Sequence, residues 1–333
     1  MYREAAPIES ESPRGGRIVA IDLARGVALA AMAIYHFTWD LELFGYVEAG
    51  LTAVGGWKLF ARCIASSFLF LAGVSLLLAH GDGIRWNGFG RRFAMVAGAA
   101  AVISVATYFT VPEAFIFFGI LHEIAAASLL GLLFLRLPAI VTFAVAACVV
   151  AAPLYLRADI FNHPSLWWVG LSTIVPRSND FVPIFPWFGA VLAGIASAKL
   201  AKGWGLFDRL RRLGIGRWSV PLGFAGRHSL AVYLVHQPVL IGLVWLAAQV
   251  APVSPATREA QFVSGCERQC VDLKDASFCT AYCACVLDTL AKDGVLDEVF
   301  AASQSQAITD KMLETAAICT VGTEASILEE APQ

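Results

Sequence analysis

The sequence contains little charge for its length. Only 15% of its 333 residues are Asp, Glu, Lys or Arg, whereas 58% are hydrophobic and the mean hydropathy is +0.68. Soluble domains carry about 25% charged residues, so a water-soluble globular domain is excluded. The composition predicts a polytopic membrane protein instead.

The sequence also lacks the short motifs of several large enzyme classes. It contains no P-loop, no dinucleotide-binding glycine fingerprint, no H-E-x-x-H and no G-x-S-x-G. Its basic residues fall in loops rather than in patches with aromatic side chains, so we expect no nucleic-acid partner. We also predict no metal site. The polar leader, residues 1–16, carries no signal-peptide cleavage pattern, and we expect it to be disordered in the cytoplasm.

What the sequence does have is a series of apolar windows. Seven of them approach the roughly 20 residues that span a bilayer, at 18–38, 59–80, 93–111, 115–135, 137–156, 181–200 and 222–250. An eighth, at 165–176, is too short and is bracketed by prolines, so we interpret it as interfacial or re-entrant. The fold class predicted is therefore all-α, a helical membrane bundle of about seven transmembrane helices over residues 17–253.

Lys and Arg residues gather in alternate loops. They precede the first window and follow the second, fourth and sixth: Arg3, Arg14, Arg17, Arg85, Arg91, Arg92, Arg136, Lys199, Lys202, Arg209, Arg211, Arg212 and Arg217. The positive-inside rule assigns these loops to the cytoplasm, so the C-terminal tail is expected on the outer side.

The tail, residues 254–333, differs in composition from the rest of the chain. From Arg258 onward it has five Lys or Arg against thirteen Asp or Glu, and it holds six of the eight cysteines: Cys266, Cys270, Cys279, Cys283, Cys285 and Cys319. An even cluster of this density favours disulfides, which persist outside the cytosol. The cysteines and the positive charges therefore independently assign the tail to the same side.

The cysteine spacing favours one pairing. "CERQC" and "CTAYC" each place cysteines at i and i+4 on one helix face, which predicts a disulfide-rich helical hairpin. Cys270 would then pair with Cys279, Cys266 with Cys283, and Cys285 with Cys319, one of the 15 connectivities that six cysteines allow. Zinc binding is the alternative, but no C-x-x-C pair or nearby histidine supports it. A passive stabilising or partner-docking role is expected for this tail.

The first apolar segment, "RIVAIDLARGVALAAMAIYHFTWDL", contains Asp22, Arg25, His36 and Asp40. At 100° per residue all four fit an arc of roughly 60°. Each charge at membrane depth costs roughly 2.5–3.5 kcal/mol, so this stripe must face other helices or a wet cavity. Asp22 and Arg25 form either a structural ion pair or part of an anion pocket. His36 is interpreted as functional, because Asp40 at i+4 can orient an imidazole.

Two later segments add candidates. His122 and Glu123 are adjacent, so their side chains point about 100° apart, and we expect one of them to make an interhelical hydrogen bond. In "GRHSLAVYLVHQPVL", Arg227 lies at the cytoplasmic start and His236 lies within the span. A satisfied core histidine explains His236 at least as well as a catalytic one.

Five fragments then occur in order: "RIVAIDLARGVALAAMAIYHFTWDL", "FLFLAGVSL", "FFGILHEIA", "DFVPIFPWFGAVLAG" and "GRHSLAVYLVHQPVL". Over roughly residues 14–250 the chain resembles bacterial members of the heparan-alpha-glucosaminide N-acetyltransferase catalytic-domain family. The resemblance implies an acyltransferase of the bacterial inner membrane. Its donor would be acetyl-CoA or another acyl-CoA bound from the cytoplasm, and its acceptor an amine or hydroxyl of a sugar or envelope glycan on the outer side.

The resemblance also implies roles for the candidate residues. Arg25, Arg91 and Arg92 would hold the cofactor's phosphates, with Asp22 and Arg227 beside them. His36 with Asp40 would act as general base, with His122 or His236 as substitutes. The eukaryotic enzymes carry a histidine in the loop that leads into the second fragment, whereas "LTAVGGWKLFARCIASS" has none here, so heparan sulfate is not implied as the acceptor.

Two other classes stay open. A transporter or channel would use the polar stripe as a permeation path, but the chain shows no halves that resemble each other, and many transporters are built from such repeats. A non-catalytic scaffold would use the cysteine-rich tail to bind a partner. Membrane lipid is an expected partner under all three hypotheses.

Overall fold

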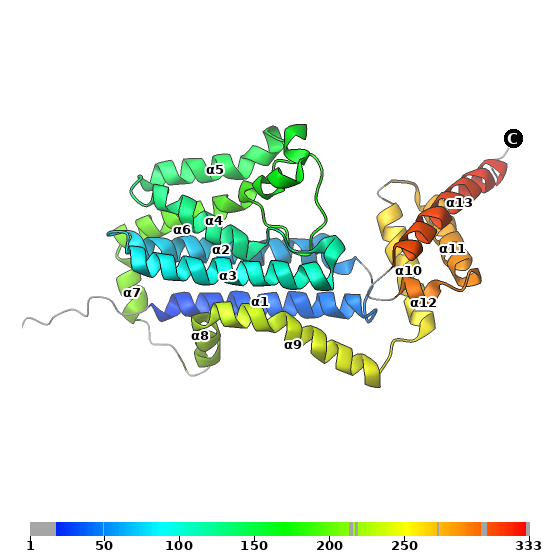
Figure 1. Cartoon of the computed structure of the whole chain (residues 1–333), viewed down its shortest axis with the longest axis horizontal. Helices are drawn as coiled ribbons and strands as arrows, with labels where there is room; N and C mark the ends of the chain where they lie inside the picture. The colour runs from blue at the N-terminus through cyan, green and yellow to red at the C-terminus, as the bar shows by residue number, and fades with distance from the viewer. Residues whose placement is uncertain are drawn as a thin grey trace, which may run out of the picture. The chain divides into compact units, whose positions relative to one another are not determined.

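The computed structural model describes residues 18–48, 50–212, 216, 219–271, 273–300 and 305–330, so the predicted leader lies outside the described residues. All the regular structure in these ranges is helical (Figure 1). The described chain forms two compact units. Unit 1 contains residues 18–30 and Ser66–Val232, and unit 2 contains Ala31–Ala65 and the residues from Tyr233 onward.

The prediction of about seven membrane helices is confirmed. Five helices are long and apolar enough to cross a bilayer: α1 (Val19–Leu43), α2 (Gly55–His80), α3 (Trp86–Thr110), α6 (Ile184–Gly203) and α9 (Ser229–Val250). Two shorter apolar segments complete the set: α4 (Ile120–Gly131) with its 3₁₀ extension η3 (Leu132–Phe134), and α5 (Ala139–Tyr155). Each of the seven segments overlaps one of the seven windows of the sequence. The chain is therefore a multi-pass membrane protein.

The last predicted window is divided in the structure. A short helix, α8 (Val220–Arg227), ends at His228, and α9 begins one residue later. The His228 backbone N–H bonds the carbonyls of Phe224 and Ala225, which closes the helix with a tight turn. Because neither Gly nor Pro occupies position 228, the apolar pattern alone shows no break there.

The eighth window forms no membrane-spanning helix. Between α5 and α6 the chain makes two 3₁₀ turns, η4 (Asp159–Asn162) and η5 (Pro164–Val169). The Asn162 side chain holds this loop together, donating to the Thr173 hydroxyl at 2.8 Å and accepting from the Ser172 hydroxyl at 2.7 Å. The loop then reaches Asp180, whose carboxylate accepts the Ile120 backbone N–H at 2.9 Å and so caps α4.

Unit 1 is held together by close helix crossings. A Cβ added at Gly73 of α2 would lie 2.1 Å from the Val191 carbonyl oxygen of α6, and one added at Gly194 of α6 would lie 2.1 Å from the Phe70 carbonyl oxygen of α2. The two backbones therefore touch. Small residues at such crossings are the main way that membrane helices pack closely.

Unit 2 contains the tail. Its helices are α10 (Pro255–Cys270), α11 (Ala276–Lys292), α12 (Leu296–Val299) and α13 (Gln306–Glu330). Val286, Leu290, Val299, Ile308 and Cys319 form their buried core. The predicted disulfide pairing is confirmed for all three bonds, Cys266–Cys283, Cys270–Cys279 and Cys285–Cys319.

Polar contacts fix the helical hairpin and its attachment. Asp275 caps α11, and hydrogen bonds from the Ser277 hydroxyl and the Phe278 backbone N–H hold the pKa of Asp275 below its usual value. Arg268 of α10 forms an ion pair with Glu48 in the loop after α1. The Tyr46 hydroxyl in the same loop donates to the Ala251 carbonyl at 2.6 Å.

Replacing Gly194 with Ala should destabilise the protein by about 1–3 kcal/mol, because the new methyl group meets a backbone carbonyl that cannot yield. The matched control is Gly98→Ala in α3, where nothing lies within 4 Å of the added Cβ. This control should be neutral or stabilise by about 0.5–1 kcal/mol through lower chain entropy. Thermal unfolding in detergent measures both, and equal melting temperatures would contradict the crossing.

Replacing Cys285 and Cys319 together with Ala should loosen α13, because their bond closes a sequence separation of 34 residues. Loss of a native disulfide in a small domain typically costs about 2–5 kcal/mol. Limited proteolysis should then cleave the tail near α13 faster than in wild type. Cys148→Ala, which removes an exposed free thiol in α5, is the control. Cleavage at wild-type rate in the double variant would argue against the assigned bond.

Candidate functional site

Four polar side chains meet within unit 2, two from α1 and two from α9. We call His36, Asp40, His236 and Gln237 the histidine cluster. The imidazole rings of His36 and His236 lie 5.0 Å apart, edge to face. The Gln237 side-chain amide donates to Asp40 Oδ1 at 2.6 Å. Asp40 is fully buried, so its carboxyl group and its hydrogen bond with Gln237 are enclosed by protein.

The hydrogen bonds of His236 determine which ring nitrogen carries its proton. Its Nδ1 lies 2.5 Å from the Tyr233 carbonyl oxygen. A carbonyl can only accept, so Nδ1 must donate, and the neutral ring then presents a lone pair at Nε2. That atom is buried and has no hydrogen-bond partner among the described residues.

Gln237 and Asp40 leave two more acceptors unused. Gln237 turns its N–H toward Asp40, so its Oε1 is the free end of the amide. Both this oxygen and Asp40 Oδ2 are buried without a partner in the described chain. A buried acceptor left unpaired costs about 1–3 kcal/mol, and three in one place indicate a site built for a ligand that donates hydrogen bonds.

The sequence identified three of the four members but not their arrangement. Asp40 was expected to orient His36, whereas its described hydrogen bond comes from Gln237, on a helix 197 residues away. His36 faces His236 instead. Gln237 was missing from the predicted site, and its only local signal was its position next to His236 within an apolar span.

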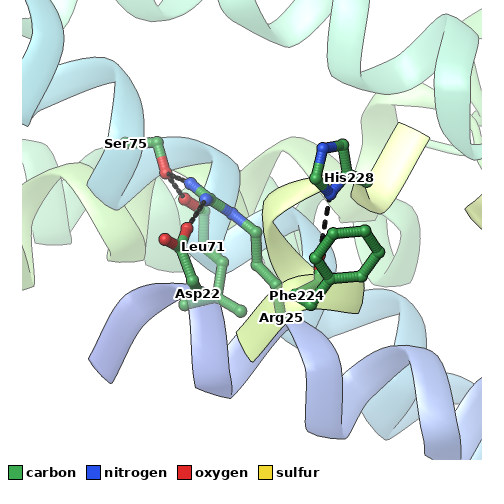
Figure 2. A network of polar contacts seen from close by, with 6 residues as sticks. All are labelled: Asp22, Arg25, Leu71, Ser75, Phe224 and His228. Carbon is green, nitrogen blue, oxygen red and sulfur yellow. Dashed lines mark hydrogen bonds and ion pairs between the residues drawn. The ribbon is translucent and has the colours of Figure 1, made fainter. Parts of the chain in front are cut away.

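A second polar group lies in unit 1, around Arg25 (Figure 2). Arg25 donates to Asp22 Oδ1 at 3.0 Å and to the Ser75 hydroxyl of α2, and Ser75 in turn donates to the Leu71 carbonyl. Asp22 is 2% exposed. The predicted ion pair is therefore present, and it joins α1 to α2.

Helix α8 closes against the same part of α1. A Cβ added at Gly226 would lie 1.7 Å from the Asp22 carbonyl oxygen, and one added at Gly26 would lie 2.0 Å from the Leu222 carbonyl oxygen. Figure 2 shows α8 beside this network, with the His228 ring over Phe224 and its Nδ1 3.1 Å from the Phe224 carbonyl. Two backbone contacts therefore hold the Asp22–Arg25 pair in place.

The other predicted cofactor residues also belong to unit 1. Arg92 in the second turn of α3 lines a cavity that includes His80, Phe89 and Ser128. Arg91, Arg92 and Arg227 are all exposed. Arg25 bonds Asp22 and Ser75, whereas Arg92 lines the cavity, so a common binding site for the four arginines stays a prediction.

His122 makes the interhelical contact that its position predicted. Its Nδ1 accepts the Gly119 backbone N–H at 3.1 Å, so its Nε2 carries the proton and faces Ser104 Oγ of α3, also at 3.1 Å. Both ring nitrogens are thus occupied, and catalysis by His122 stays a prediction. Its neighbour Glu123 is fully buried, and neither of its oxygens has a hydrogen-bond partner within the described residues.

No group of three or more His, Cys, Asp or Glu side chains in the described ranges is placed to hold a metal ion. The prediction of a metal-free site is left untested by this search.

Comparison with known proteins gives one match. The family model described as "Heparan-alpha-glucosaminide N-acetyltransferase, catalytic" matches residues 17–238, which is 222 of the chain's 333 residues. This range includes both polar groups and ends one residue after Gln237. No curated protein and no solved structure matches the chain.

Replacing Arg25 with Met should destabilise the protein by up to about 3–5 kcal/mol, because the ion pair between Arg25 and the buried Asp22 carboxylate is lost. The double variant Asp22→Asn/Arg25→Gln removes both charges and should recover much of that loss. Thermal unfolding of the two variants in detergent tests this. A single variant as stable as wild type would show that the pair has no structural role.

Proposed function

The chain belongs to the family of heparan-alpha-glucosaminide N-acetyltransferase catalytic domains, a family of membrane acyltransferases, and we propose that it moves an acyl group from acyl-CoA to a sugar or envelope glycan. Acetyl-CoA is the donor that the family implies. The histidine cluster carries the proposal for the acceptor, because it offers buried hydrogen-bond acceptors and no competing donor at those atoms.

The reaction follows from the free atoms of that cluster. An amine or hydroxyl group of the acceptor donates its hydrogen to His236 Nε2, whose lone pair the Tyr233 carbonyl fixes in place. As the acceptor's nitrogen or oxygen attacks the thioester carbonyl, its proton passes to Nε2, the C–S bond breaks, and CoA leaves as the thiolate. Asp40 Oδ2 and Gln237 Oε1 accept further hydrogen bonds from the same ligand and so orient it.

His36 also has a role in the proposed mechanism. Its ring lies against that of His236, so it shapes the same site and can take the proton in turn. The sequence favours His36 as the general base, whereas the hydrogen bonds of the structure support His236. Separate substitutions of the two histidines distinguish these assignments.

Residues of unit 1 are the proposed contacts for the donor. Arg25, Arg91, Arg92 and Arg227 carry guanidinium groups, which bind phosphate oxygens with paired N–H groups. Asp22 holds Arg25 in one orientation. The phosphates of CoA are anionic, so this surplus of positive charge favours them at the face that the sequence assigns to the cytoplasm.

The orientation in the membrane is also a proposal. Lys and Arg gather on one set of loops, which supports a cytoplasmic N-terminus in a bacterial inner membrane. Three disulfides in the tail support an oxidising, extracytoplasmic location for its helices. An acyl group taken from cytoplasmic acyl-CoA would then reach an acceptor on the outer side.

The test uses purified protein in liposomes, with labelled acetyl-CoA on one side and an amino sugar trapped on the other. His236→Ala should lower the transfer rate by roughly 10²–10⁴, the usual contribution of a general base. Binding of acetyl-CoA should persist in this variant. His163→Ala, which changes an exposed histidine in the loop between α5 and α6, should transfer at wild-type rate.

The companion variant is His36→Ala. If it abolishes transfer while His236→Ala does not, the general base is His36, as the sequence favours. Transfer that survives both substitutions would remove the histidine cluster from the mechanism. Wild-type protein that neither binds acetyl-CoA nor transfers acetyl to any acceptor would refute the enzyme and favour the transporter or scaffold.

A further inference from the structure

A cavity in unit 1 lies between α2, α3 and α4. Its walls are mostly apolar, with a few polar side chains among them. Its lining is Ala72, Leu76, His80, Phe89, Arg92, Phe93, Val96, Ala125 and Ser128. Most of this surface is aliphatic or aromatic, and the cavity volume of about 20 Å³ leaves room for one oxygen-sized group. The polar atoms come from His80, Arg92 and Ser128.

His80 lines this cavity and is held there by ring packing and a hydrogen bond. The ring is 6% exposed and packs edge-on against Phe89, with 5.6 Å between the ring centroids. Its Nδ1 accepts the Arg85 backbone N–H at 3.2 Å. A ring that accepts at Nδ1 carries its hydrogen on Nε2, so His80 presents an N–H donor.

The cavity's other polar side chains are those of Arg92 and Ser128. Arg92 has a guanidinium, which can only donate hydrogen bonds. Ser128 already gives its hydrogen to the Ile124 carbonyl at 2.6 Å, so it adds no donor. The donors of this cavity are therefore two N–H groups on different helices, beside an apolar wall.

We infer that His80 and Arg92 bind a phosphate oxygen of acyl-CoA at this cavity. A phosphate oxygen suits these residues because it accepts hydrogen bonds from N–H groups, whereas the thioester carbonyl reacts at the histidine cluster. The inference rests on the proposed function, and it adds His80 as a binding residue. The cavity's donors suit the acyl donor, just as the acceptors of the histidine cluster suit an amine or hydroxyl.

Two substitutions of His80 separate its two hydrogen bonds. Asn places its amide near the position of Nδ1, so His80→Asn can still accept from Arg85 but loses the donor at Nε2. Gln reaches the Nε2 position with an N–H, so His80→Gln keeps the donor and loses the contact with Arg85. A merely structural role predicts the opposite ranking, because it depends on the contact that Asn preserves.

Binding is measured on the full-length protein in detergent with acetyl-CoA, 3′,5′-ADP and S-acetylpantetheine as separate probes. His80→Asn should bind acetyl-CoA roughly ten- to hundredfold more weakly, as expected for one lost hydrogen bond to a strong acceptor. His80→Gln should stay near wild type, and Arg92→Gln should also weaken binding. Arg136→Gln removes an exposed arginine after η3 and should leave binding unchanged.

The probes identify the oxygen. A loss of 3′,5′-ADP binding in His80→Asn assigns His80 to phosphate and supports the inference, whereas a loss of S-acetylpantetheine binding alone overturns it. Folded His80→Asn that binds all three probes like wild type overturns it, even if acyl transfer persists. If wild type binds the probes through His80 but transfers no acyl group, the inference stands and the proposed function fails.

Discussion

Membrane burial makes every polar atom depend on a partner inside the protein, because lipid supplies none. Most polar groups of this chain meet that requirement. Arg25 is paired with Asp22 and Ser75, and both ring nitrogens of His122 are occupied. Lys199 donates to two carbonyls at the junction of η3 and α5. These contacts join helices and explain why the charged residues stay within an apolar bundle.

Some buried polar atoms lack a hydrogen-bond partner, and they are not evenly distributed over the described chain. Three of the six buried side-chain atoms without a partner in the described chain belong to the histidine cluster: Asp40 Oδ2, His236 Nε2 and Gln237 Oε1. All three are acceptors, and they lie on residues that contact one another across α1 and α9. A site for an amine or hydroxyl explains both their chemistry and their proximity.

Local sequence patterns were enough to predict much of the fold. Apolar windows predicted the seven membrane segments, since their length follows from bilayer thickness. The i, i+4 cysteines predicted the tail hairpin, because a helical hairpin brings Cys270 opposite Cys279 and Cys266 opposite Cys283. The i, i+3 spacing of Asp22 and Arg25 likewise identified a real ion pair. Each of these features depends on neighbours within a few turns of helix.

Features that depend on distant residues could not be predicted in this way. The hydrogen bond between Gln237 and Asp40 joins positions 197 residues apart, so no local spacing pattern predicts it. The proton position on His236 depends on a carbonyl whose direction only the folded helix fixes. His80 was overlooked for the same reason: its role depends on a backbone N–H beyond the helix end and on an arginine of the next helix.

The most direct measurement is a structure of the protein with a non-reactive amino-sugar acceptor analogue bound. We predict that the analogue's N–H or O–H groups lie within hydrogen-bond distance of His236 Nε2 and of at least one of Asp40 Oδ2 and Gln237 Oε1. An analogue bound elsewhere, with ordered lipid or an apolar side chain filling the space beside these three atoms, would contradict the assignment of the acceptor site.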